Sequence, residues 1–155
     1  MNLAKKIALF LATGCLVGYF PVAPGTLGSV EGVLLAFFVS GFTPLCALLF
    51  LIVFTALSMW ISHIAEKAVG RKDPGCIVID EIAGMMAAML WLPFTVKYAI
   101  ACFITFRVLD IIKPFPIRYI ESRLPGGIGI VADDLVAGVA ANLLVRGLFA
   151  VFGLF

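Results

Sequence analysis

The run PLCALLFLIVFTALSMWIS, residues 44–62, contains no charged side chain and decides the fold class. A helix needs about 20 apolar residues to cross a lipid bilayer, so this run is long enough for one crossing. Only a segment that satisfies its own backbone hydrogen bonds is stable in lipid, which favours a helix over an open strand. We therefore predict a membrane helix over residues 44–62.

Further apolar runs lie on both sides of this one, and we predict helices over residues 30–40, 81–93, 97–112 and 134–152. Several are shorter than a full crossing, which indicates tilt, local thinning of the bilayer or burial against longer neighbours. Residues 3–19 form another apolar stretch, which either crosses the membrane or lies at its surface. The sequence thus predicts an all-α, polytopic membrane protein of about five to six helices, with residues 1–155 in a single domain.

The composition supports a membrane environment and argues against binding to nucleic acid. Hydrophobic residues make up 63% of the 155 residues, charged residues make up 13%, and the mean hydropathy is +1.18. Soluble domains are typically about half apolar and about a quarter charged. A formal net charge of +2, without interleaved aromatic and basic residues, does not indicate a nucleic-acid partner. The four cysteines stand singly in apolar surroundings, so we expect buried thiols rather than metal ligands.

The distribution of basic residues predicts how the chain is oriented. If crossings alternate, the connections near residues 41–44 and 93–98 share one side of the membrane, and those at 63–79 and 113–133 share the other. The first pair carries only Lys97, whereas the second pair carries Lys67, Arg71, Lys72, Lys113, Arg118 and Arg123. Because basic loops tend to stay in the cytoplasm, we predict that the second pair faces the cytoplasm, together with residues 20–29.

Four polar clusters fall on this same side: residues 21–29, Asp80–Glu81, residues 107–113 and Asp133–Asp134. They are far apart in the sequence, but all are predicted to lie at a similar depth in the membrane. A carboxylate near the centre of a bilayer costs about 2.5–3.5 kcal/mol even on the mildest insertion scale, so acids that adjoin apolar runs indicate function. We predict that the four clusters form one polar site at the cytoplasmic interface.

The two acidic pairs predict a metal site. An acidic side chain at the start of a helix also serves as a cap, and this alternative stays open for both pairs. Capping needs one side chain, however, and each pair supplies two carboxylates. Without matching cations, the carboxylates repel one another unless a divalent ion joins them, and oxygen ligands alone suit Mg²⁺. We expect Mg²⁺ to be bound by Asp80, Glu81, Asp133 and Asp134, which suggests phosphate chemistry with a metal-activated water.

The third cluster places Arg107, Asp110 and Lys113 three residues apart, and therefore on one face of a helix that Pro114 ends. A self-neutralising row of ion pairs is one interpretation. In the other, Asp110 is a further metal ligand or a base. Arg107 and Lys113 are then the cations that hold a phosphate.

Two weaker signals complete the predicted site. Gly25, Thr26 and Ser29 offer bare amides and hydroxyls for phosphate oxygens, although Pro- and Gly-rich segments also simply turn a chain. His63 is the only histidine and closes the run 44–62 on the side of the site. It either transfers a proton to a leaving alkoxide or only lies at the interface.

Taken in order, these motifs resemble the bacterial phosphatidylglycerophosphatase A family over roughly residues 11–145. The resemblance rests on Pro21-x-x-Pro-Gly-Thr-x-Gly-Ser29, His63, Gly75-x-Ile-Val-x-Asp-Glu81 with Gly84, Phe106-Arg-x-x-Asp-x-x-Lys-Pro-x-Pro-Ile-Arg118, and Gly126-Gly-x-Gly-Ile130 followed by Asp133-Asp-x-x-Ala-Gly138. The resemblance implies hydrolysis of phosphatidylglycerophosphate to phosphatidylglycerol and inorganic phosphate, with Mg²⁺, in the bacterial cytoplasmic (inner) membrane. The role of each residue stays an inference from its chemistry.

Two other functional classes stay open on the residues alone. A cation channel or carrier also needs acids in membrane helices, but its acids should line a path that reaches both faces. A CDP-alcohol-type phosphotransferase also combines clustered acids with a metal, but it spreads those acids over helical turns in a pattern that this sequence lacks.

Overall fold

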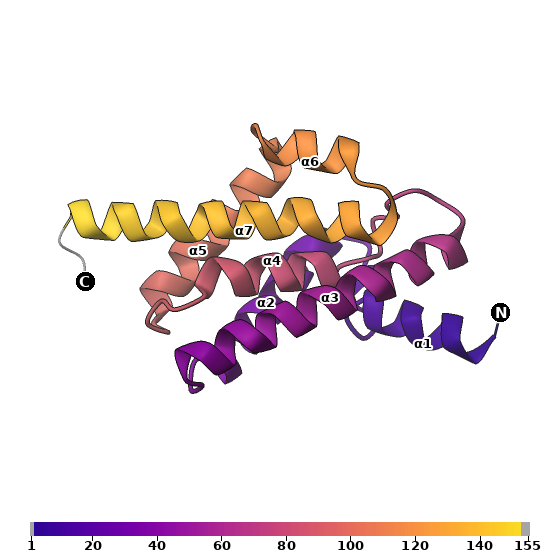
Figure 1. The fold of residues 1–155 in the computed structure, drawn as a ribbon, viewed down its shortest axis with the longest axis horizontal. Coiled ribbons are helices and arrows are strands. Elements are labelled where there is room, and N and C mark those ends of the chain that lie inside the picture. The colour runs from indigo at the N-terminus through magenta and orange to yellow at the C-terminus, as the bar shows by residue number, and fades with distance from the viewer. Residues whose placement is uncertain (1, 153–155) are drawn as a thin grey trace.

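The computed structural model describes residues 2–152 and shows a bundle of helices (Figure 1). These residues contain no strand and form seven α-helices and one short 3-10 helix: α1 (Leu3–Ala12), η1 (Val17–Tyr19), α2 (Pro24–Val39), α3 (Pro44–Val69), α4 (Ile79–Met89), α5 (Val96–Ile112), α6 (Ile117–Arg123) and α7 (Gly126–Val151). The predicted all-α class is confirmed. The number of helices exceeds the predicted five to six because α6 forms inside a segment that was predicted as a connection.

Two helices, α3 and α7, are long and apolar enough to cross a membrane, with 26 residues each. At 1.5 Å per residue, each measures roughly 39 Å. The helices α2, α4 and α5 are shorter, at 16, 11 and 17 residues. The first helix, α1, has 10 residues and is followed by Gly14, Cys15 and Leu16 with positive φ angles. Residues 3–19 therefore do not form one continuous membrane helix.

Four predicted helix boundaries were wrong. α2 begins at Pro24 rather than at residue 30, and α7 begins at Gly126 rather than at residue 134. α3 ends at Val69 rather than at residue 62, and α4 ends at Met89 rather than at residue 93. Glycines that look like loop residues in the sequence are helix positions at which a neighbour leaves no room for a side chain. A Cβ atom on Gly28 would lie 2.8 Å from Cβ of Val78, for example. Most of the segment 21–29, which was predicted to contact phosphate oxygens, is therefore helical.

The central helix is α4, which packs against α2, α3, α5 and α7. Figure 1 shows it between α3 and α7. Every residue of α4 except Glu81 is buried, so this helix carries its acids into the interior. Nearer the other end of the bundle, the rings of Tyr98 and Phe149 stack with their centroids 4.4 Å apart.

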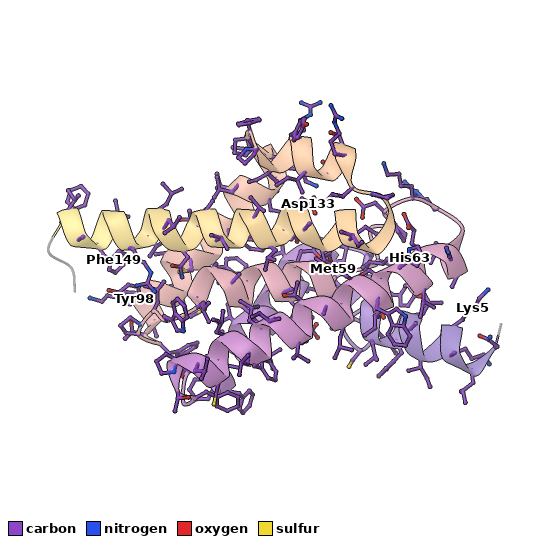
Figure 2. All side chains as sticks on the ribbon, viewed as in Figure 1. Lys5, Met59, His63, Tyr98, Asp133 and Phe149 are labelled. Carbon is purple, nitrogen blue, oxygen red and sulfur yellow. The ribbon has the colours of Figure 1, made fainter. Side chains whose placement is uncertain are left out.

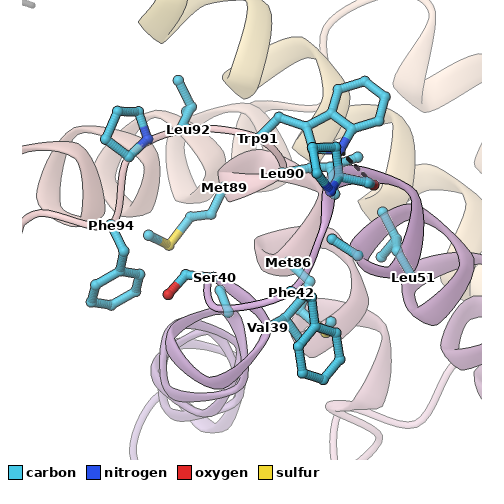
Figure 3. A pocket seen from close by; sticks show the side chains of 14 residues that line it. Val39, Ser40, Phe42, Leu51, Met86, Met89, Leu90, Trp91, Leu92 and Phe94 are labelled. Carbon is cyan, nitrogen blue, oxygen red and sulfur yellow. Dashed lines mark hydrogen bonds between the residues drawn. The ribbon is translucent and has the colours of Figure 1, made fainter.

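The loops gather at two ends of the bundle, in the pairs that the sequence predicted. At one end, the indole N–H of Trp91 donates to the carbonyl oxygen of Pro44 at 3.0 Å. A cavity of about 280 Å³ lies beside this contact and is lined mostly by apolar side chains, including Val39, Leu51, Met86 and Phe94 (Figure 3). At the other end, a small polar pocket is lined by residues of the loop before α4, of α6 and of α7, among them Lys72, Asp73, Glu121 and Asp133.

The outward surface of the bundle is largely apolar. Phe38, Val53 and Leu143 are each more than half exposed, and many other large apolar side chains accompany them. Such an extended apolar surface marks contact with lipid or with another protein. The cysteines depart from the prediction, because Cys102 is buried but Cys15 and Cys46 are exposed.

Candidate active site

Three carboxylates meet where α4 begins. Oxygen atoms of Asp80, Glu81 and Asp134 all lie within 4.8 Å of one another. Asp80 and Asp134 are buried, and Glu81 is partly buried. We call these three residues the acid cluster. Two pairs that are far apart in the sequence thus contribute to one site, as predicted, although one member of the second pair stands outside the cluster.

The close approach of α4 and α7 brings the acid cluster together. A Cβ atom on Gly84 would lie 2.7 Å from the backbone oxygen of Asp134 and 2.7 Å from the ring of Phe106. One turn further, Gly138 presses directly against the carbonyl oxygen of Gly84, where a side chain would not fit. Because neither glycine has a side chain, the two backbones approach closely enough for their acids to share one site.

The acid cluster is not explained by helix capping. Val78 is the N-cap of α4 and Pro125 is the N-cap of α7, and neither makes a side-chain capping bond. Asp80 and Glu81 lie in the first turn of α4, where a negative charge is favourable, but Asp134 lies well inside α7. The capping alternative is therefore wrong for the second pair and insufficient for the first.

The chemistry of the acid cluster fits a divalent cation. Asp80 Oδ1, Glu81 Oε2 and Asp134 Oδ2 are all buried and accept no hydrogen bond from the protein. Buried polar atoms are normally hydrogen-bonded, so unsatisfied oxygens on three neighbouring carboxylates call for a partner. An all-oxygen donor set of this kind suits Mg²⁺. Asp80, Glu81 and Asp134 are accordingly the residues that would hold the ion.

Arg107 places a positive charge beside the acid cluster. Its Nη1 atom donates to Asp110 Oδ2 at 2.8 Å and lies 3.9 Å from Glu81 Oε1. The same atom donates to the hydroxyl of Ser29 at 3.4 Å. The Nε atom of Arg107 is buried without a partner. Asp110 thus orients a guanidinium that retains hydrogen-bonding capacity beside the acid cluster.

The α2 residues that were predicted to contact phosphate lie next to Arg107. Ser29 is fully buried and donates its hydroxyl to the carbonyl oxygen of Gly25 at 2.9 Å. Gly25 lies directly against the carboxylate of Glu81, and a Cβ atom there would also come within 3.3 Å of Arg107 Nη2. Thr26 is partly buried in the first turn of α2, and its amide donates to the carbonyl oxygen of Ala23 at 3.0 Å. The structure therefore brings Gly25 and Ser29 to the site within a helix rather than within a loop.

Asp133 and Lys113 form a separate pair. Lys113 Nζ donates to Asp133 Oδ2 at 2.6 Å and lies 3.2 Å from Glu121 Oε1 on α6. Lys113 follows the last turn of α5 with a positive φ of 47°, which turns it away from the row that Arg107 and Asp110 begin. Burial lowers the pKa of Lys113, but its bonds to the two carboxylates outweigh burial and raise the pKa above its usual value. The partners of the Lys113 cation are therefore Asp133 and Glu121 rather than the acid cluster.

His63 lies outside the acid cluster and packs against the start of α7 (Figure 2). A Cβ atom on Gly126 would lie 2.6 Å from its Nδ1 atom, and one on Gly127 would lie 2.5 Å from its backbone nitrogen. The exposed imidazole therefore faces the first turn of α7 and the nearby Glu66.

Sequence reasoning missed two polar residues of α7. Asn142 is buried and Arg146 is partly buried, in a stretch that was predicted as a plain apolar helix. The side chains bond to each other and to the end of α4, at distances of 2.7–3.4 Å. The available signal was an arginine within an apolar run, which is costly in lipid unless it has a partner.

Comparison with known proteins points to one family. A family model described as phosphatidylglycerophosphatase A matches residues 10–149. The phosphatidylglycerophosphatase A of Haemophilus influenzae is 35% identical over 154 residues, covering 93% of this chain and 93% of the relative. That of Escherichia coli is 35% identical over 130 residues, covering 83% of this chain and 76% of the relative. A protein of Bacteroides thetaiotaomicron, named as a candidate phosphatidylinositol-3-phosphatase, is 32% identical over 153 residues, covering 94% and 95%. No solved structure matches the chain.

Proposed function

Because the chain belongs to the phosphatidylglycerophosphatase A family, and is therefore a phosphatase that acts on a phosphomonoester, we propose how its residues carry out that reaction. The proposed substrate is phosphatidylglycerophosphate, and the products are phosphatidylglycerol and inorganic phosphate. Water attacks phosphorus, the bond from phosphorus to the glycerol oxygen breaks, and the departing oxygen takes up a proton. The proposed reaction is Mg²⁺-dependent.

One observation carries the Mg²⁺ proposal: three buried carboxylate oxygens without a hydrogen-bond partner belong to side chains whose oxygens lie within 4.8 Å of one another. When bound, Mg²⁺ would polarise a phosphoryl oxygen and help to orient the attacking water. Asp80, Glu81 and Asp134 would hold the ion. Asp133 is a weaker proposal as a ligand, because Lys113 bonds to its Oδ2 atom and its unpartnered Oδ1 atom is not part of the acid cluster.

The cations of the site would bind and orient the phosphate. Arg107 has an unpaired Nε atom, and a planar guanidinium matches two phosphate oxygens at once. Asp110 holds this guanidinium by a 2.8 Å bond, so we assign Asp110 an orienting role ahead of the base or ligand role that the sequence allowed. Lys113 would contribute a second positive charge from the side of α6.

The α2 helix would complete the phosphate site. Gly25 lets α2 approach Glu81 and Arg107 closely, because a Cβ atom at this position would collide with the Glu81 carboxylate. Ser29 accepts a hydrogen bond from the same Nη1 atom of Arg107 that donates to Asp110. Thr26 would contact the glycerol or the phosphate of the substrate.

The proposed location is the bacterial inner membrane, crossed several times, with the site at the cytoplasmic interface. Two helices of sufficient length and an apolar outer surface support membrane insertion. The basic loops at the end of the bundle that holds the acid cluster support the cytoplasmic orientation. Glu81, Arg107 and Asp110 keep side-chain exposures of 13–16%, so the polar site is not sealed from a lipid headgroup at that depth.

A second substrate deserves a direct test because of one relative. The Bacteroides thetaiotaomicron protein is about as similar to this chain as the two phosphatidylglycerophosphatases are, and its name refers to a lipid with a phosphate on an inositol ring. Both lipids present a phosphomonoester on a headgroup at the membrane surface. Phosphatidylinositol 3-phosphate is therefore the comparison substrate.

The decisive experiment measures inorganic phosphate released from phosphatidylglycerophosphate by protein purified in detergent, first with Mg²⁺ and then with excess EDTA. We expect release with Mg²⁺ that EDTA abolishes and that added Mg²⁺ restores. Release that survives EDTA would keep the substrate and overturn the metal proposal. Release from phosphatidylinositol 3-phosphate alone would overturn the substrate. Ion flux in proteoliposomes or CMP release, without phosphate release, would favour a carrier or a phosphotransferase.

A further inference from the structure

Four residues of α7 recur every four positions: Asp134, Gly138, Asn142 and Arg146. Residues four apart lie on the same face of a helix, and all four contact or face α4. We call this row the α7 stripe.

A matching row of α4 consists of Asp80, Gly84 and Ala88, again four positions apart. The first three residues of the α7 stripe each follow their partner on α4 by 54 positions: Asp80 with Asp134, Gly84 with Gly138 and Ala88 with Asn142. The two helices therefore run parallel in one register from the acid cluster to the end of α4.

The far end of α4 needs hydrogen-bond donors. The last four carbonyl groups of a helix have no partner within that helix. At this end of α4, the backbone N–H groups of Leu90 and Leu92 donate to the carbonyl oxygens of Ala87 and Met89. Ala88 is fully buried, so water does not reach its carbonyl oxygen and neighbouring helices must supply donors.

The last two residues of the α7 stripe supply these donors. Asn142 Nδ2 donates to the carbonyl oxygens of Ala88 and Leu90 at 2.9 Å, and to that of Ala87 at 3.4 Å. Arg146 Nη2 donates to Leu90 at 2.9 Å, and Arg146 Nε donates to Asn142 Oδ1 at 2.7 Å. The arginine thus orients the amide that caps α4. Its positive charge also lies at the negative end of the α4 dipole.

We propose that Asn142 and Arg146 are positioning residues for the acid cluster. They fix the far end of α4 against α7, so that Asp80 and Glu81 at the near end stay opposite Asp134. A helix is stiff along its axis, and a slip at the capped end therefore moves the carboxylates eight residues away, roughly 12 Å along the helix. This inference rests on the proposed function in one respect, namely that the acid cluster binds Mg²⁺.

The test measures metal affinity without relying on turnover. Full-length protein in detergent is melted at increasing Mg²⁺ concentrations, and the midpoint of the Mg²⁺-dependent stabilisation is recorded. Asn142→Leu, which keeps a similar size but removes the donor, should raise this midpoint by about tenfold, since supporting residues around a metal site typically matter by 10–100-fold. Leu143→Ala, at the exposed neighbouring position, should leave it unchanged.

A second pair of variants covers the case in which Asn142→Leu does not fold. Arg146→Lys keeps a cation able to donate to Leu90, whereas Arg146→Leu does not. We expect the midpoint to rise more in Arg146→Leu than in Arg146→Lys. The same order is expected for the Mg²⁺ concentration that supports half-maximal phosphate release.

The outcomes separate this inference from the proposed function. If the wild-type protein is stabilised by Mg²⁺ and the variants only melt earlier, with the same midpoint, the cap is merely structural and the inference is overturned while the metal site stands. If Mg²⁺ does not stabilise the wild-type protein, the metal proposal fails and this inference fails with it.

Discussion

The carboxylate of Asp133 accepts a hydrogen bond from Lys113 at 2.6 Å, whereas its neighbour Asp134 joins the acid cluster. Two adjacent, identical side chains therefore have different surroundings. Successive residues of a helix point about 100° apart, so Asp134 faces α4 while Asp133 faces Lys113 at the end of α5, whose other partner is Glu121 of α6. This difference leads to a direct test of which acids bind the metal.

Asp134→Asn should reduce Mg²⁺-dependent phosphate release by more than about 100-fold, because it removes a charge from the acid cluster. Mutating a residue that only supports a metal ligand already lowers metal affinity or activity by about 10–100-fold. Asp133→Asn should act mainly on substrate binding, by raising KM, because it loosens Lys113. Both are checked by phosphate release at varied Mg²⁺ and varied lipid. An equal shift of the Mg²⁺ midpoint in the two variants would show that both acids are ligands.

Arg107→Lys should lower kcat/KM by about 10-fold or more, although the charge is kept. A lysine cannot reproduce the planar fork that contacts Ser29, Asp110 and a phosphate together. Arg118→Lys is the matched control, because Arg118 is exposed on α6. The comparison uses phosphate release by both variants at equal amounts of folded protein. Similar activities would remove Arg107 from the phosphate site.

Gly84→Ala should destabilise the protein by about 1–3 kcal/mol, the usual cost of inserting an extra methyl group into a packed interior. The new methyl would lie 2.7 Å from the backbone of Asp134 and 2.7 Å from the ring of Phe106, so Mg²⁺-dependent activity should fall as well. The measurement is thermal unfolding in detergent beside phosphate release.

Gly147→Ala provides the control for Gly84→Ala. Gly147 also lies in a helix, but a Cβ atom there would meet nothing within 4 Å. Since alanine favours a helix over glycine by about 1 kcal/mol, this change should be neutral or stabilising. Equal destabilisation by both changes would contradict the close contact of α4 and α7.

His63→Gln should lose far less activity than the roughly 10²–10⁴-fold that loss of a general acid or base costs. The imidazole packs against Gly126 and Gly127 and does not belong to the acid cluster. The pH dependence of phosphate release by the variant provides a second measurement. A large loss with a changed pH profile would restore the role in proton transfer that the sequence allowed for His63.

The sequence was sufficient to predict properties that depend on apolar runs and on the distribution of charge. The run 44–62 lies within α3, the loops gather in the predicted pairs, and Asp80, Glu81 and Asp134 meet at one end. Such features follow from local composition, because an apolar run must be covered and acids at similar depths can meet. They do not require knowledge of which helix touches which.

The remaining features depend on contacts between helices, which one sequence does not display. The first residues of α2 and α7 look like turns because of their glycines, yet Gly28 and Gly127 lie where other chain segments press close. Asp133 and Asp134 are equivalent in a linear pattern and differ only once α4 and α6 are in place. Arg146 donates to Leu90, which precedes it by 56 residues, so this contact is visible only in the fold.

The placement of the charged motifs also limits where the reaction's products emerge. The acid cluster, Arg107 and Lys113 lie at one end of the bundle, while the cavity at the opposite end is lined by residues without an ionisable side chain. In the proposed function, the lipid headgroup would therefore enter, and the phosphate would leave, on one side of the membrane. The reaction would then need no passage of an anion through the bilayer.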